Sequence, residues 1–164
     1  MIEVKECTFE PFCVIGVVGE AGKGSGALWT KMNKSGKQLM PLARRDDDGD
    51  IMGAWGLTTE DTLTFRLPKK DDPHLLYMAG LEVEDTAHPP VGFTKWIVPG
   101  SDYIYGLVQN SKKETLDALL QYAEAKDLEI TGYPQEFMPP QTAGASGTQN
   151  TMYLFLPVKN GLDQ

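Results

Sequence analysis

The sequence predicts an α+β fold in which two pseudo-twofold-related β-α-β-β repeats form an antiparallel sheet with two helices on one face. Its 164 residues suffice for one domain with a substantial core. Strand-like and helix-like patterns occur in the same order before and after Pro89-Pro90. We therefore expect a single domain over 1–164, with repeat one at about 1–88 and repeat two at about 91–164.

The first repeat opens with a β-rich run at 12–18, which is typical of a central strand. A glycine-rich turn follows, and Ser25 or Gly26 then starts a helix that ends at Gly36. The apolar positions of this helix are Leu28, Trp29 and Met32.

Two strands complete the first repeat, at 51–57 and 75–84. Trp55 in the earlier strand belongs either to the core or to a pocket wall. In the later strand Tyr77 lies on the apolar face, and Glu82 is expected on the opposite face at a solvated end.

The second repeat places strands at 93–98 and 103–108. Ser111 and Glu114 then match a capping box, which predicts a helix that runs to about Lys126. Its apolar stripe is Leu116, Leu119, Leu120 and Ala123. Two final strands are expected at 132–138 and 152–158.

The composition narrows the function. A net charge of −8 argues against direct nucleic-acid binding, which needs a basic surface, and suits positively charged ligands. There is no signal pattern and no apolar run of about 18 residues, so we expect a cytoplasmic protein without membrane contact. Cys7 and Cys13 form no CxxC pair, and both histidines are isolated, which predicts no metal site and no cofactor.

Two motifs resemble ligand-binding loops without matching them. In the glycine-rich turn at 19–26, Val17 and Gly24 stand where a phosphate-binding loop needs glycine and a hydroxyl residue. The acidic run at 46–50 lacks the spacing of a calcium-binding loop. Both are expected to be turns.

Glu136 is the main candidate for a functional residue. By strand alternation Glu136 and Met138 share one face, and Gln135 and Phe137 share the other. Either Glu136 faces water on an edge strand, or it lies inward among aromatic and thioether side chains. An inward carboxylate requires a partner, and a cationic ligand is one possibility.

The order and spacing of these segments resemble the GyrI-like small-molecule-binding domain, which is also the effector-binding module of AraC-type and MerR-type multidrug regulators. The residues that carry the resemblance span nearly the whole sequence: 14–16, 28–29, 79–83, 98–103, Pro134, Glu136 and 156–159.

This resemblance implies an aromatic pocket that binds hydrophobic, planar, cationic small molecules without catalysis. By position, Glu136 is similar to the acidic residue that binds lipophilic cations in the family. The resemblance implies that the other pocket residues are Met138, Tyr153, Tyr105, Trp55, Tyr77 and Trp29. Met138 departs from the family, where an aromatic residue is usual.

Two other functions remain open. Some relatives of this fold are hydrolases of strained electrophilic rings, so Glu136 with Tyr153 or Tyr105 could act as general base and acid. The family name also suggests a partner protein such as gyrase. The 164 residues leave no room for a DNA-binding helix-turn-helix, so a regulator would need a separate DNA-binding partner.

Overall fold

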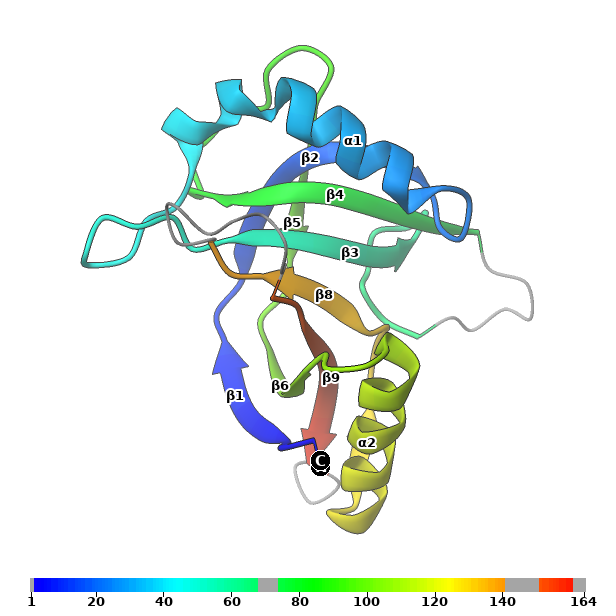
Figure 1. The fold of residues 1–164 in the computed structure, drawn as a ribbon. Helices are drawn as coiled ribbons and strands as arrows, with labels where there is room; N and C mark the ends of the chain where they lie inside the picture. Colours follow the sequence, from blue (N-terminus) through cyan, green and yellow to red (C-terminus); the bar gives the residue numbers. More distant parts are fainter. Residues whose placement is uncertain (1, 68–73, 141–150, 161–164) are drawn as a thin grey trace.

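The computed structural model describes residues 2–67, 74–140 and 151–160 (Figure 1). Among these residues nine strands form one antiparallel sheet in the order β1-β6-β9-β8-β3-β4-β2-β5, with β7 paired to β9. The strands are β1 Lys5–Phe9, β2 Phe12–Glu20, β3 Ala54–Glu60, β4 Leu75–Val83, β5 Thr94–Val98, β6 Ser101–Leu107, β7 Leu128–Ile130, β8 Gln135–Met138 and β9 Tyr153–Asn160.

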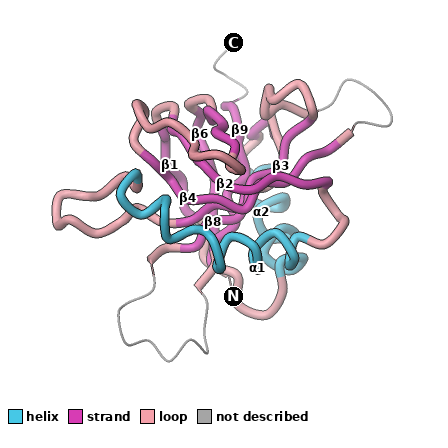
Figure 2. The backbone as a smooth tube through the Cα atoms, turned by 90° about the horizontal axis from the view of Figure 1, so that it is seen from above, coloured by secondary structure: helices cyan, strands magenta, loops and turns pink. Residues whose placement is uncertain are grey.

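Both α-helices lie on the same side of the sheet (Figure 2). Helix α1, Ser25–Ser35, packs on β2 and β4, and a 3-10 helix, η1 Gly36–Leu42, continues from its end. Helix α2, Lys112–Ala125, packs on β6, β7 and β9. The side chain of Ser111 accepts a hydrogen bond from the Glu114 backbone N–H, so the predicted cap of α2 is confirmed.

The pairing of the strands repeats across the middle of the sheet. In the first half β4 lies between β2 and β3, and in the second half β9 lies between β6 and β8. The two halves join where β3 pairs with β8, and α1 and α2 follow β2 and β6 respectively. This arrangement confirms the predicted α+β fold of two β-α-β-β repeats.

The face of the sheet away from the helices carries an aromatic cluster. Its aromatic members are Phe9, Phe12, Trp55, Phe65, Trp96, Tyr103, Tyr105, Phe137, Tyr153 and Phe155. The ring centroids of Phe9 on β1 and Trp55 on β3 lie 6.1 Å apart, although three strands separate β1 from β3 in the sheet. The sheet therefore curls around this cluster, and the helices cover its convex face.

The helix side has two separate cores. One packs Met32 of α1 against β2 and β4, and the other packs Leu119 of α2 against β6 and β9. Glu136 of β8 lies between them, because it is opposite Gly56 on β3 and Leu154 on β9.

Some local structure differs from the sequence-based expectation. Strands β1 and β7 and helix η1 were not predicted, and β3 begins three residues later than expected. Glu82 was expected at a solvated end but is only 6% exposed. Its carboxylate accepts a hydrogen bond from the Trp55 indole at 2.9 Å and lies 3.7 Å from the Arg44 guanidinium, so two partners offset part of the cost of its burial.

Candidate functional site

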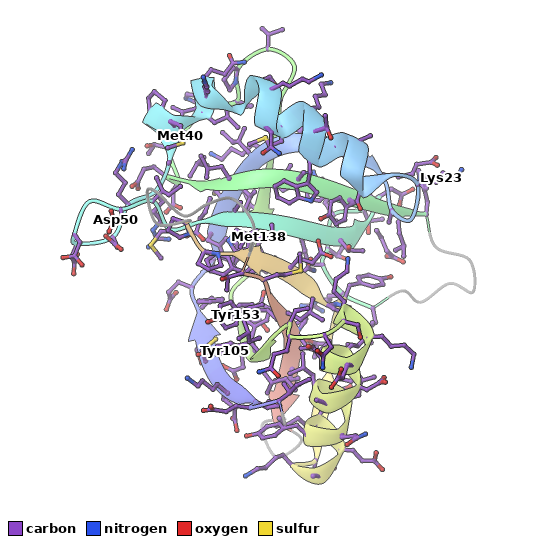
Figure 3. All side chains as sticks on the ribbon, in the orientation of Figure 1. Lys23, Met40, Asp50, Tyr105, Met138 and Tyr153 are labelled. Carbon is purple, nitrogen blue, oxygen red and sulfur yellow. The ribbon has the colours of Figure 1, made fainter. Side chains whose placement is uncertain are left out.

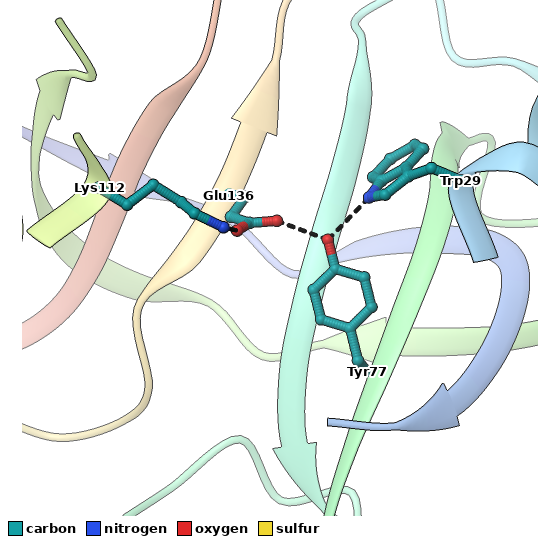
Figure 4. Close-up of polar contacts among 4 residues, drawn as sticks. All are labelled: Trp29, Tyr77, Lys112 and Glu136. Atoms are coloured by element: carbon teal, nitrogen blue, oxygen red, sulfur yellow. Dashed lines mark hydrogen bonds and ion pairs between the residues drawn. The ribbon is translucent and has the colours of Figure 1, made fainter. Parts of the chain in front are cut away.

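Four side chains from four elements form a continuous polar network, which we call the Glu136 network (Figure 4). The Trp29 indole N–H of α1 donates to the Tyr77 hydroxyl of β4 at 2.9 Å. The Tyr77 hydroxyl donates to Oε1 of Glu136 at 2.5 Å. The Lys112 ammonium of α2 donates to Oε2 of Glu136 at 2.8 Å. The network thus connects the helix of the first repeat to the helix of the second.

Gly56 makes this arrangement possible. It lies on β3 between Ala79 of β4 and Glu136 of β8. Tyr77 is two residues from Ala79 and therefore shares its face. A Cβ atom at Gly56 would lie 2.1 Å from the Tyr77 hydroxyl and 2.4 Å from Oε1 of Glu136. Only glycine leaves room for Tyr77 to reach across β3 to the carboxylate.

Burial decreases along the network from Tyr77 to Lys112. Tyr77 is 7% exposed, and the side chains of Glu136 and Lys112 are 15% and 57% exposed. Burial raises the pKa of Tyr77, and the hydrogen bond to Glu136 raises it further. The tyrosine is therefore a neutral hydrogen-bond donor at physiological pH. The carboxylate also has partners within the protein, Tyr77 and Lys112, as an inward-facing carboxylate requires.

A hollow of about 250 Å³ lies beside Glu136. We call it the Glu136 hollow, and its lining is Thr58, Lys112, Lys113, Leu116, Pro134, Glu136 and Leu154. The apolar part of the lining comes from α2, β9 and the segment before β8. A carboxylate at the edge of an apolar hollow offers one charge and a surface for hydrophobic contact.

The structure brings together three of the predicted site residues, Glu136, Tyr77 and Trp29. Met138 is on the same face as Glu136, since it is two residues away on β8, but it does not line the hollow.

Trp55, Tyr105 and Tyr153 lie elsewhere, which corrects the expectation that they share a pocket with Glu136. Trp55 and Tyr153 pair with Phe137, and Tyr105 pairs with Phe155. These residues belong to the aromatic cluster on the opposite face of the sheet. Figure 3 shows Tyr105 and Tyr153 on neighbouring strands, and their ring centroids are 6.1 Å apart.

Sequence reasoning missed Lys112 and the burial of Glu82. Lys112 is the first residue of α2, where the helix dipole disfavours a positive charge. That unfavourable position is a signal that the lysine has a partner outside the helix. For Glu82 the available signal was strand alternation, which places it on the same face of β4 as Met78. Alternation did not reveal that the Trp55 indole is its partner.

The two loop motifs are turns, as expected. Lys23 of the glycine-rich turn pairs with Glu20 at 2.9 Å, and both are exposed. Asp46 accepts hydrogen bonds from the backbone N–H groups of Asp48 and Asp50 in an exposed loop, where Figure 3 labels Asp50. Over 2–67, 74–140 and 151–160 no cluster of three or more His, Cys, Asp or Glu could hold a metal ion.

A larger hollow, of about 570 Å³, lies away from the Glu136 network. It is formed near Phe65, Tyr103 and Pro157, and the charged side chains around it are exposed to solvent. None of the residues predicted for the site lines this larger hollow, so we do not take it as the candidate site despite its greater volume. Within the described part of the chain no helix has the length and apolar character needed to span a bilayer.

The sequence matches no protein-family model and no curated protein. Several solved structures are nevertheless similar over almost the whole chain. The C-terminal domain of EcmrR has a TM-score of 0.66 at 10% identity, with 98% of this chain and 99% of that domain covered. SAV2435 bound to tetraphenylphosphonium has a TM-score of 0.62 at 16% identity, with 98% and 95% covered.

A third similar structure is a hydrolase from Listeria innocua. Its TM-score is 0.54 at 14% identity, with 96% of this chain and 92% of the hydrolase covered. At such identities the likeness shows the fold alone. It is consistent with the resemblance that the sequence indicated, because this chain shares the fold of the EcmrR C-terminal domain and of SAV2435.

Proposed function

We propose that this protein binds hydrophobic, cationic small molecules, including planar ones, at the Glu136 hollow and does not transform them. The observation that carries the proposal is the position of Glu136 between the two repeats, at the edge of an apolar hollow and hydrogen-bonded to Tyr77. The fold it shares with SAV2435, which was solved with tetraphenylphosphonium, supports the same class of ligand.

The contacts available are sufficient for useful affinity. The carboxylate supplies the charge, and Leu116, Leu154 and Pro134 supply apolar surface. Burial of apolar ligand surface contributes about 25 cal/mol per Å². Micromolar binding, about −8 kcal/mol, is then attainable after the costs of association. Few atoms of the ligand are fixed by such contacts, so we expect broad specificity.

The test is the variant Glu136→Gln, which keeps the shape of the side chain and removes its charge. We expect it to bind tetraphenylphosphonium, rhodamine or crystal violet at least about tenfold more weakly than the wild type, because a buried charged contact is worth about 1.5–3 kcal/mol. Affinity is measured by calorimetry or dye fluorescence. Glu124→Gln removes the same charge from an exposed position on α2 and is the matched control. Unchanged affinity in Glu136→Gln would remove Glu136 from the site.

A second candidate function is hydrolysis of a strained electrophilic ring. The hydrogen bond between Tyr77 and Glu136 favours it, because a general acid and a general base are already in contact. Tyr77 replaces the tyrosines that the sequence suggested, since Tyr105 and Tyr153 lie on the other face of the sheet. Turnover of a cyclopropane substrate that is lost in both Glu136→Ala and Tyr77→Phe would support this function. Binding of the same compound without turnover would contradict it.

A further inference from the structure

Both oxygens of the Glu136 carboxylate already have a donor. Oε1 accepts from the Tyr77 hydroxyl at 2.5 Å, and Oε2 accepts from the Lys112 ammonium at 2.8 Å. An organic cation that enters the Glu136 hollow therefore meets a carboxylate whose charge is already paired. To make close contact it must replace one of the two donors.

The two donors differ in how easily they move. Tyr77 is 7% exposed, and its hydroxyl also accepts a hydrogen bond from Trp29. The Lys112 side chain is 57% exposed and ends a flexible four-carbon stem. An ion pair with one partner this exposed is weak. Lys112 is therefore the donor that leaves.

The position of Lys112 on the helix supports a role outside the helix. As the first residue of α2 it lies at the end where the dipole disfavours cations. The neighbouring Lys113 has a partner within the helix, Asp117 at 3.3 Å. Lys112 instead reaches 24 positions along the sequence to Glu136.

Lys112 also limits the size of the hollow that it lines. The hollow measures about 250 Å³, slightly below the range of about 300–1,000 Å³ that is usual for ligand pockets. If the ammonium moved into solvent, the hollow would widen and the carboxylate would be free. Both changes favour a bulky cation.

We propose that Lys112 is an internal counter-ion that competes with cationic ligands for Glu136 and thereby sets the affinity and charge selectivity of the site. This inference rests on the proposed binding function. In the empty site the ammonium neutralises the carboxylate, and in the occupied site it extends into solvent. A purely structural role is the alternative, in which Lys112 only attaches α2 to β8.

The experiment compares Lys112→Met with Lys31→Met. Both variants remove one positive charge from a helix, but Lys31 is an exposed residue of α1 that does not line the Glu136 hollow, so the change in net charge is matched. Tetraphenylphosphonium and tetraphenylborate, which have the same shape and opposite charges, are titrated into each variant and the wild type by calorimetry. Lys112→Gln is included as a second, polar replacement, and thermal melting confirms that each variant is folded.

We expect Lys112→Met to bind tetraphenylphosphonium about two- to fivefold more tightly than Lys31→Met, the factor that corresponds to a partly exposed ion pair. Tetraphenylborate should show no such gain. Equal affinities for tetraphenylphosphonium in the two variants, with wild-type binding that still depends on Glu136, would overturn the role of Lys112 and leave the proposed function intact. Equal tightening of both ions would also overturn it, since a larger hollow alone would then explain the gain. Failure of every variant to bind tetraphenylphosphonium would overturn the proposed function as well.

Discussion

The substitution Gly56→Ala tests whether the space above β3 is required for the Glu136 network. The backbone of Gly56 is not in the left-handed region, so alanine is conformationally allowed and the effect is steric. The added methyl group would lie 2.1 Å from the Tyr77 hydroxyl and 2.4 Å from Oε1 of Glu136. Both distances are far below van der Waals contact, so at least one side chain must move and their hydrogen bond must break.

The expected cost follows from these contacts. Loss of a hydrogen bond to a charged group costs about 1.5–3 kcal/mol. Overpacking of a buried site costs about a further 1–3 kcal/mol. In a protein of this size each kcal/mol lowers the melting temperature by about 2–4 °C. We therefore expect Gly56→Ala to melt at least about 5 °C below the wild type and to lose affinity for tetraphenylphosphonium.

The matched control is Gly26→Ala, at an exposed position of α1 where an added Cβ meets no atom within 4 Å. Alanine is favoured over glycine in a helix by up to about 1 kcal/mol, so this variant should be neutral or slightly stabilised. Melting is followed by circular dichroism and binding by calorimetry. A melting temperature of Gly56→Ala within about 2 °C of the wild type, with ligand affinity retained, would refute the steric argument.

Three further predictions concern other parts of the molecule. Burial raises the pKa of Glu82 above its ordinary value of 4.5, despite the Trp55 hydrogen bond and Arg44. The native state therefore binds this proton more tightly than the unfolded chain does. As the pH rises from 4.5 through the folded pKa, Glu82 consequently lowers the stability of the protein. Urea unfolding between pH 4.5 and 8 should therefore show Glu82→Gln gaining stability relative to the wild type as the pH rises, and a pH-independent difference would contradict this assignment. Burial, with a smaller contribution from Asp102, raises the pKa of Cys7 from 9.0 to about 11. At pH 8 iodoacetamide should therefore label Cys7 on the order of 100-fold more slowly in the folded protein than in urea, as measured by mass spectrometry in a Cys13→Ala background. Similar labelling rates in both states would show that the pKa of the thiol is not raised. Ser111→Ala should destabilise the protein by about 1 kcal/mol in urea titrations because the Glu114 N–H loses its acceptor, whereas an unchanged midpoint would mean that water replaces the cap.

Much of the fold was predictable because hydrophobic runs, capping residues and glycine or proline breaks in the sequence coincide with the ends of helices and strands in the structure. The apolar run of β2, the capping box of α2 and the breaks at glycine and proline each correspond to an observed boundary. Strands β1 and β7 had weaker signals. Leu128–Ile130 is only three residues long, and it is a strand because it pairs with β9.

The site was only partly predictable, because alternation within one strand does not fix the register between strands. The sequence shows that Tyr153 and Leu154 point to opposite faces, but the pairing of Glu136 with Leu154 decides which of them lies beside the carboxylate. That pairing is set by the whole sheet, so the aromatic residues of β9 were assigned to the wrong side. Tyr77 and Trp29 do lie in one hydrogen-bond network with Glu136, although these hydrogen bonds could not be foreseen from spacing.

Strand β8 sends Glu136 toward the helices and Phe137 into the aromatic cluster, where its ring lies 4.6 Å from that of Trp55. Under the proposed function, ligand preference and thermal stability depend on alternate residues of the same short strand. A mutant library restricted to the helix-facing positions could explore new small molecules while the opposite face continues to hold the scaffold. Substitutions on the helix-facing side can then alter ligand contacts while the packing of the aromatic cluster stays unchanged.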